Sequence, residues 1–323
     1  MAWREAVVDN SPFVYLRAEL LRMYYIVFGL LYVISLLPFP VLYLLSDILY
    51  FILYFIAGYR RKVVTNNLLL AFPEKTNEER KAIARKFYRR FTDNWIESLK
   101  LLSISEKQLG KHITTDLEAL HTVYATGRNV HFLMGHQFNW EWANSVIPPR
   151  TPYKTLVAYS PISNKIVDRM FLYQRQRFGA TMLPYNEMGK AMLPYRRTQY
   201  LLALVADQNP HNPRKSYWLN FMGQPTAFVQ GPEKGARLGN IPVVYLSFSR
   251  PRRGYYHMQT SLVEMNPGNS AEGELTRKYV ALLEENIRRY PELYLWSHKR
   301  WKHNWSEAYE KLWIDTGKPP LHR

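Results

Sequence analysis

A long apolar segment near the N-terminus constrains the fold of this chain most strongly. Across residues 24–59 the only charged side chain is Asp47. Basic residues lie on both sides of the segment, with Arg17 and Arg22 before it and a run of three at residues 60–62 after it. Because basic residues mark the cytoplasmic side of a membrane segment, both ends are expected on that side, so the segment enters the bilayer and returns.

Pro38 and Pro40 divide this segment into two shorter apolar pieces. Each piece is below or near the roughly 20 residues that a straight helical crossing needs. We therefore predict a membrane anchor over residues 23–62, either a bent helical hairpin or a monotopic, partly immersed element. A single tilted span and a buried helix pair of a soluble protein are the alternatives.

The residues before the anchor differ from it in composition. Residues 1–22 are mixed polar and charged and are interpreted as an N-terminal extension. Met23 opens the apolar run directly, which makes it a candidate start of translation. A cleavable signal peptide is not expected, because the apolar run is too long and no small-residue cleavage site follows it. Residues 63–323 are long enough to form one catalytic domain.

Composition narrows the class of protein. The 323 residues carry a formal net charge of +17, which implies an anionic partner: nucleic acid, an anionic lipid surface or a phosphorylated substrate. The chain has no cysteine, which excludes thiol nucleophiles, disulfides and cysteine-bound zinc. Aromatic residues make up 15% of the chain, a share that suits a protein at a bilayer interface.

After a basic, amphipathic helix predicted over residues 75–102, short apolar stretches alternate with helical patterns. Such alternation is typical of an α/β fold with a mixed sheet flanked by helices. The basic face of the first helix lies either in solvent or against anionic headgroups. The predicted strands cover residues 130–134, 155–159, 181–183, 200–206, 243–248, 255–263 (an edge strand in a hairpin) and 293–296; further helices cover 116–125, 140–146, 163–178, 187–195, 231–238 and 272–289.

His136 and Glu141 follow the first of these strands and are the strongest candidates for chemistry. Gly135 permits a sharp exit from the strand, and a helix is predicted to begin at Trp140. With His136 in the turn and Glu141 in the first helical turn, the carboxylate is expected to reach one imidazole nitrogen. The other nitrogen is then free to take a proton from a hydroxyl group. A histidine with a purely structural role is the alternative.

Other polar side chains are candidates for substrate binding. Asp207 and Gln208 end an apolar strand, where α/β enzymes tend to keep site residues, although a turn-forming role is equally compatible. Arg169, Arg175 and Arg177 lie on one predicted helix and could bind a phosphate or a pantetheine arm, or else form a solvated face. The turn at residues 220–228 leads to glycines at 231, 235 and 239, which indicate either close helix packing or a flexible loop that covers an acyl chain. Motifs of serine hydrolases, nucleotide-binding loops and zinc proteases do not occur.

The ordered set of these blocks resembles the bacterial lipid A biosynthesis late acyltransferases, a family within the H-x4-D/E glycerolipid acyltransferases. The resemblance runs from about Met23 to Trp305. It includes Asn66-Asn67-Leu68, Gly135-His136 with Asn139-Trp140-Glu141, Arg169 with Arg175 and Arg177, Asp207-Gln208, Phe221-Met222-Gly223 and the segment from Leu295 to Trp301. Phe138, Ser160 and Met222 depart from the usual family residues and are expected to line the substrate groove.

The resemblance implies a glycerolipid-acyltransferase-like fold and acyl transfer from an acyl carrier protein to a lipid A precursor, a phosphorylated glycolipid. It implies His136 as general base, Glu141 as its orienting partner, and Asn139, Arg169, Arg175, Arg177 and Asp207 as substrate-binding residues. It implies no cofactor and no metal, and a place at the cytoplasmic face of the bacterial inner membrane. Chain length and acceptor position stay open.

Two other functions compete with this interpretation. A lysophospholipid or an amino-acid-containing lipid could accept the acyl group, because the same base serves any hydroxyl. A basic, membrane-associated protein that binds nucleic acid is the non-enzymatic alternative. The long apolar segment and the lack of a recognisable RNA- or DNA-binding module argue against it, so nucleic acid is not expected as a partner.

Overall fold

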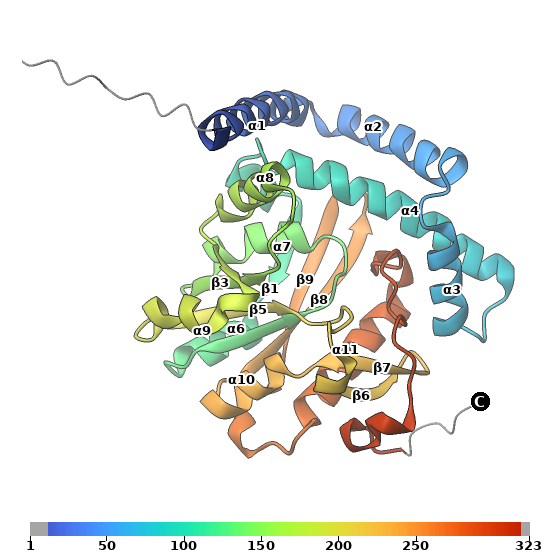
Figure 1. The fold of residues 1–323 in the computed structure, drawn as a ribbon, viewed down its shortest axis with the longest axis vertical. Coiled ribbons are helices and arrows are strands. Elements are labelled where there is room, and N and C mark those ends of the chain that lie inside the picture. The colour runs from blue at the N-terminus through green and yellow to red at the C-terminus, as the bar shows by residue number, and fades with distance from the viewer. Residues whose placement is uncertain (1–11, 318–323) are drawn as a thin grey trace, which may run out of the picture.

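The computed structural model describes residues 12–317, which form a seven-stranded mixed sheet with helices on both faces (Figure 1). The predicted fold class is confirmed in this respect. The strand order is β1-β9-β8-β2-β5-β3-β4. The strands are β1 (Ile113–Asp116), β2 (Val130–Met134), β3 (Lys154–Tyr159), β4 (Thr181–Pro184), β5 (Tyr200–Val205), β8 (Val243–Arg252) and β9 (Tyr255–Glu264).

β2 lies at the centre of the sheet, and all five of its residues are buried. It pairs in parallel with β5 and β8, and β3 and β4 continue in the same direction beyond β5. A strand buried on both faces reads as a continuous apolar run, which explains why residues 130–134 were recognisable. β2 and β5 are adjacent and in register, with Met134 opposite Val205, so the loops after them meet at one edge.

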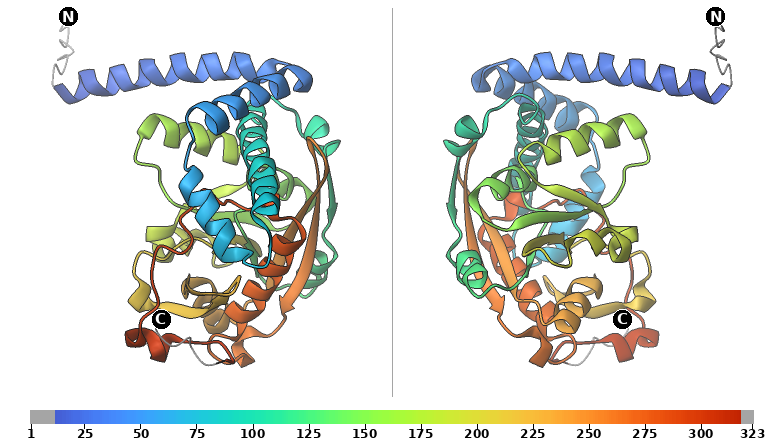
Figure 2. Two further views of the ribbon diagram at one scale, coloured as in Figure 1. Left: turned by 90° about the vertical axis from the view of Figure 1, so that its right-hand side faces the viewer. Right: turned by 90° about the vertical axis from the view of Figure 1, so that its left-hand side faces the viewer.

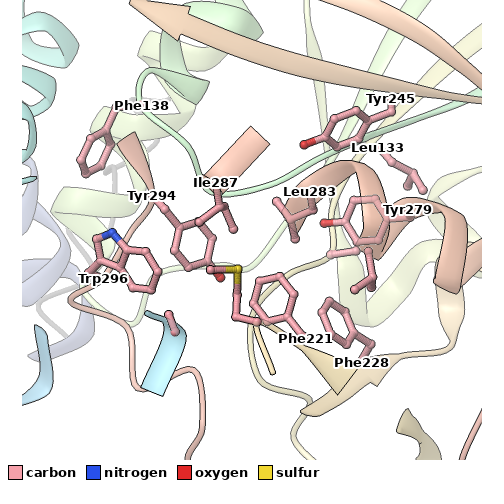
Figure 3. Packing of buried hydrophobic residues seen from close by; sticks show 14 of the residues in the cluster. Leu133, Phe138, Phe221, Phe228, Tyr245, Tyr279, Leu283, Ile287, Tyr294 and Trp296 are labelled. Atoms are coloured by element: carbon pink, nitrogen blue, oxygen red, sulfur yellow. The ribbon is translucent and has the colours of Figure 1, made fainter. Parts of the chain in front are cut away.

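Two hydrophobic clusters cover the two faces of the sheet. One face carries α5 (Glu106–Gly110), α6 (Glu118–Ala125) and α7 (Trp140–Val146), which pack on Val130, Phe132 and Met134. The other face carries α3 (Arg61–Ala71), α4 (Asn77–Lys100), α10 (Gly231–Gly239) and α11 (Glu274–Arg289). Figure 3 shows part of the second cluster, where Leu283 and Tyr279 of α11 lie near Leu133. The alternation of β2 side chains between clusters follows the two-residue period of a strand.

A separate hairpin of β6 (Ser216–Phe221) and β7 (Gln224–Val229) lies beside α11. The predicted turn within residues 220–228 is confirmed at Met222 and Gly223, which both have positive φ, as a two-residue hairpin turn requires. Met222 and Phe138 are fully buried, so neither lines a groove. Phe138 packs against Phe87 of α4 instead, with ring centroids 6.0 Å apart.

The apolar segment forms α1 (Pro12–Leu36), α2 (Phe39–Phe51) and a π-helical turn η1 (Ile52–Ile56). The helix breaks at Leu37 and Pro38, as the prolines predicted. α1 and α2 form an open V across one end of the molecule (Figures 1 and 2). Helix α1 passes through Met23 without a break, whereas residues 1–11 of the predicted extension lie outside the described residues.

Most large side chains of this segment are exposed, which contradicts the buried helix pair of a soluble protein. The stretch Phe39–Ile56 has a mean hydropathy of 2.0 and is long enough to cross a membrane, and only 17% of it is buried. The buried side chains are Leu42, Ser46 and Tyr50, four residues apart on one face that packs against α4. The exposed ones include Met23, Tyr25, Ile26, Leu30, Val33, Leu36, Val41, Leu44, Ile48, Phe51, Phe55 and Ile56.

Three predicted elements differ from the structure. β9 forms the predicted hairpin with β8 but is not an edge strand, because the short and polar β1 pairs with its other side. Residues 293–296 are not a strand: a turn after Pro291 leaves only a bridge between Tyr294 and Gln137. Residues 187–195 form the single-turn α9 (Met188–Ala191) between two short 3₁₀ turns, one of which contains Pro194. The other predicted helices and strands are present, with ends shifted by a few residues.

Candidate active site

The predicted strand, turn and helix around His136 are confirmed. β2 ends at Met134, and α7 begins at Trp140. Asn139 is the N-cap of α7, because its Oδ1 accepts a hydrogen bond from the backbone N–H of Trp142 at 3.1 Å. The loop between them is held by the backbone N–H of Phe138, which donates to the carbonyl of Leu293.

The His136 side chain pairs with Asp207, which follows β5. Nδ1 of His136 lies 2.6 Å from Oδ1 of Asp207, and the backbone N–H of His136 donates to Oδ2 at 3.0 Å. Asp207 is buried, whereas the imidazole is partly exposed. The two carboxylate oxygens of Asp207 therefore both bind His136, one at the ring and one at the backbone. This arrangement leaves Nε2 of the ring to exchange a proton.

Electrostatics keep Asp207 ionised. Burial alone raises the pKa of its carboxyl group, but the two contacts from His136 and the nearby Arg300 hold the pKa below its ordinary value. An ionised Asp207 accepts the Nδ1–H of His136, which selects the tautomer with a free Nε2. The pair thus has the arrangement of a general base and its orienting group.

Glu141 has a different partner from the one predicted. Its two oxygens accept hydrogen bonds from Nε and Nη2 of Arg175 at 2.9 and 2.5 Å, and one oxygen also accepts from the indole N–H of Trp140. The predicted contact between Glu141 and an imidazole nitrogen is therefore wrong. Because the helix begins at Trp140, Glu141 points toward α8 (Lys165–Gln176), which carries Arg175. Trp140 lies between the two pairs, with its ring centroid 5.3 Å from that of His136.

Comparison with known proteins identifies the family. Residues 15–303 match the model of the bacterial lipid A biosynthesis acyltransferases. The chain is 23% identical over 278 residues to a lipid A biosynthesis lauroyltransferase of Escherichia coli. That alignment covers 85% of this chain and 89% of the relative. It is 24% identical over 243 residues to a lipid A biosynthesis acyltransferase of Haemophilus influenzae, with 73% and 74% covered. The chain belongs to this family. It is an acyltransferase of lipid A biosynthesis, as the resemblance implied.

The other predicted substrate-binding residues of this acyltransferase have contacts within the protein. Asn139 is fully buried, and its Nδ2 donates to Glu97 of α4 at 3.0 Å. Arg177 donates to the carbonyls of Leu101 and Ile104, just beyond the C-terminus of α4. Arg169 stacks on the ring of Tyr24 at 4.3 Å and so connects α8 to α1. Of these predicted residues, Asp207 contacts His136 and Arg175 contacts Glu141.

Two residues near the site, Arg300 and His298, were not among the predicted site residues; the basic and aromatic segment that contains them was interpreted only as a candidate phosphate contact. Arg300 is buried, donates to Asn209 Oδ1 at 3.2 Å and stacks 4.2 Å from the ring centre of Phe228. His298 accepts a hydrogen bond from the backbone N–H of Asn209 at Nε2, and burial together with Arg300 lowers its pKa to about 4. Both residues hold the segment that follows Asp207. The position of Arg300 between Trp296 and Trp301 in the sequence could have indicated such a role. A cation among large apolar side chains needs a polar partner when it is buried.

Gly135 of the acyltransferase is required for space rather than for an unusual φ. Its φ is not positive, but a Cβ atom there would lie 2.4 Å from Cδ1 of Leu283 and 3.7 Å from Oδ2 of Asp207. Gly135→Ala should lower the free energy of unfolding by about 1–3 kcal/mol, because Leu283 must move within a packed core. Urea denaturation measures this. Gly189→Ala, where a Cβ meets nothing within 4 Å, is the matched control, and an equal loss in both variants would contradict the account.

Proposed function

We propose that this chain transfers a fatty acyl group from the thioester of an acyl carrier protein to a hydroxyl of a lipid A precursor. The contact between His136 and the buried Asp207 carries the proposal. Nε2 of His136 takes the proton of the acceptor hydroxyl, and the oxygen attacks the thioester carbonyl. The tetrahedral intermediate then expels the thiolate of the carrier, which receives that proton from the imidazolium. No covalent enzyme intermediate is needed.

The Glu141–Arg175 pair is proposed to orient the substrate beside this base. Glu141 is buried, and its two oxygens hold Nε and Nη2 of Arg175 in a bidentate geometry. Within residues 12–317 no hydrogen bond reaches Nη1 of Arg175, whose side chain is partly exposed. This nitrogen is therefore proposed to donate to an anionic oxygen of the substrate or of the tetrahedral intermediate. The net charge of +17 suits both a phosphorylated acceptor and an acidic carrier protein.

An assay with defined donors and acceptors tests this function. Acyl carrier proteins loaded with several chain lengths are incubated with the purified protein and either a lipid A precursor or a lysophospholipid, and products are identified by mass. Acylated precursor at a rate well above that of the lysophospholipid is expected. Acylation of the lysophospholipid alone would contradict the proposed acceptor, and coenzyme A thioesters serving better than carrier-protein thioesters would contradict the proposed donor.

We also propose that residues 23–62 anchor the catalytic domain of residues 63–323 to the cytoplasmic face of the inner membrane. Helix α2 is tied to the domain along one face, by Leu42, Ser46 and Tyr50, and by Asp47, which pairs with Arg253 at 2.8 Å. A helix held along its length cannot also cross the bilayer by itself. An in-plane position, with the exposed apolar side chains among the lipid headgroups and acyl chains, fits these contacts.

A charge on the exposed face of α2 tests the anchor. Ile48 is half exposed in the structure. Ile48→Asp should weaken partition into phospholipid vesicles at least about tenfold, because an apolar side chain of this size contributes about 1.5–3 kcal/mol when buried. Vesicle flotation measures this. Leu238→Asp, at the exposed end of α10 opposite α1 and α2 in Figure 1, is the control. Equal flotation of Ile48→Asp and wild type would contradict the proposed membrane surface.

A further inference from the structure

Glu97 of α4 joins three parts of the molecule that are distant in sequence. It has no exposed surface, and its carboxylate receives four side-chain donors. Oε1 accepts from the hydroxyl of Tyr43 at 3.0 Å and from Arg250 at 3.4 Å. Oε2 accepts from Nδ2 of Asn139 at 3.0 Å and from the hydroxyl of Tyr256 at 2.6 Å. Buried carboxylates need such donors, but these come from α2, from the β8–β9 hairpin and from the active-site loop.

On the active-site side, Glu97 holds the start of α7 at two points. Its side chain receives Nδ2 of Asn139, and its backbone carbonyl receives the indole N–H of Trp142 at 2.9 Å. Asn139 is the N-cap of the helix that carries Glu141, and it lies three residues after His136. A shift of Asn139 therefore moves Glu141 and changes the loop that leads to His136.

On the anchor side, the contacts continue to the exposed helix. Asp93, one turn before Glu97, accepts from Ser46 of α2 at 2.8 Å and from Arg250 at 2.7 Å. Arg253 joins Asp93 to Asp47. Figure 1 shows the ends of β8 and β9 reaching α4 beneath α2. Tyr43 and Asn139 both donate to the Glu97 carboxylate. The side chain of Glu97 therefore links the apolar helix α2 directly to the loop that carries His136.

We infer that Glu97 is a positioning residue that couples the seating of α2 on a lipid surface to the geometry of the loop at residues 135–141. The inference rests on the proposed function and extends it. When α2 is seated, the Tyr43 hydroxyl and the Asp47–Arg253–Asp93 contacts hold Glu97 in place, and Glu97 holds the N-cap of α7. A loop held within a fraction of an ångström matters, because a misplacement of about 1 Å can cost about 100-fold in rate.

Hydrogen–deuterium exchange of the full-length protein tests the coupling without any acyl substrate. Amides within residues 139–146 are followed with and without vesicles of phosphatidylethanolamine and phosphatidylglycerol. In wild type, vesicles should slow their exchange several-fold. Tyr43→Phe, which removes the hydroxyl donor of α2 to Glu97 and leaves the Asp47–Arg253–Asp93 contacts, should at least halve this vesicle effect. Tyr153→Phe, which removes a hydroxyl bond to the Arg128 carbonyl elsewhere, should respond as wild type does. A wild-type response in Tyr43→Phe would overturn the coupling.

Kinetics give the second readout. Glu97→Gln should lower kcat of acyl transfer about tenfold and leave KM within about twofold, because the substituted amide cannot accept from all four donors and the loop shifts. An unchanged kcat, or a change confined to KM, would overturn the positioning role. If Glu97→Gln does not fold, Tyr43→Phe decides alone. Exchange needs no acyl donor, so loss of transfer to every acceptor with the exchange pattern intact would refute the proposed function and not the coupling.

Discussion

Replacing His136 by alanine should lower kcat of acyl transfer by about 1,000-fold, within the range that a positioned general base contributes. Among the histidines of residues 12–317, only His136 combines a buried carboxylate on Nδ1 with a partly exposed ring at the end of β2. Without it, the acceptor hydroxyl must lose its proton to water. Steady-state transfer of a radiolabelled acyl group measures the loss, and circular dichroism checks that the fold is retained.

The control for this variant is His121→Ala. His121 is an exposed histidine on α6, and within residues 12–317 its ring bonds only to the carbonyl of Arg150, at 3.3 Å. Its removal should leave kcat within about twofold, since exposed side chains away from a site contribute little. If His136→Ala kept more than a tenth of the wild-type rate, His136 would not be the base.

Asp207→Asn should have a comparably large effect, lowering kcat by about 100- to 10,000-fold. In serine proteases the equivalent change at the carboxylate behind the catalytic histidine costs about 10,000-fold by favouring the wrong tautomer. Here the amide would offer an N–H or a weaker acceptor to Nδ1, so Nε2 would no longer be free to take a proton. In the native protein Nδ1 of His136 lies 2.6 Å from Oδ1 of Asp207. A distance this short indicates a strong hydrogen bond, which the variant loses.

The same variant has a predicted effect on stability with a defined pH dependence. The pKa of Asp207 is lower in the folded protein than in the unfolded chain, so its carboxylate stabilises the fold above the ordinary pKa of about 4. That contribution is lost as the pH falls through the lower, folded-state pKa. Asp207→Asn should therefore reduce the free energy of unfolding at pH 7 by about 1.5–3 kcal/mol, and by less in strong acid. Urea denaturation at several pH values measures the difference.

Glu141→Gln distinguishes the role of the Glu141 carboxylate from that of the Asp207 carboxylate. It weakens the hold on Arg175 and should lower kcat, but it leaves the contact between His136 and Asp207 in place. The pH at which kcat/KM rises should therefore shift in Asp207→Asn and stay near the wild-type value in Glu141→Gln. A shift in Glu141→Gln alone would show that Glu141, as the sequence predicted, is the partner of the imidazole.

The strand, loop and helix around His136 were predictable because their signals are local. The run of apolar residues at 130–134, the glycine and the helix former at Trp140 lie next to each other in the chain. The partner of His136 was not predictable in the same way. Asp207 lies 71 residues away in the sequence and comes close to His136 only because β2 pairs with β5. Both residues follow strand ends, and their proximity depends on which strands are neighbours, which periodicity does not reveal.

Buried polar contacts account for the other differences. Asn139 and Arg177 are residue types that bind substrates, yet here one caps α7 and the other caps the end of α4. Glu97 gave no signal, since a glutamate in an amphipathic helix usually faces solvent. The prolines at 38 and 40 predicted the break between α1 and α2, but not that Leu42, Ser46 and Tyr50 would attach α2 to the domain.

The most direct test of the central claim is the mass of the lipid product. Purified wild type, His136→Ala and Asp207→Asn are each incubated with acyl carrier protein thioester and a lipid A precursor. The account predicts a product heavier by one acyl group with wild type, and almost none with either variant, while both variants still float with vesicles. Wild-type amounts of that product from His136→Ala would contradict the account.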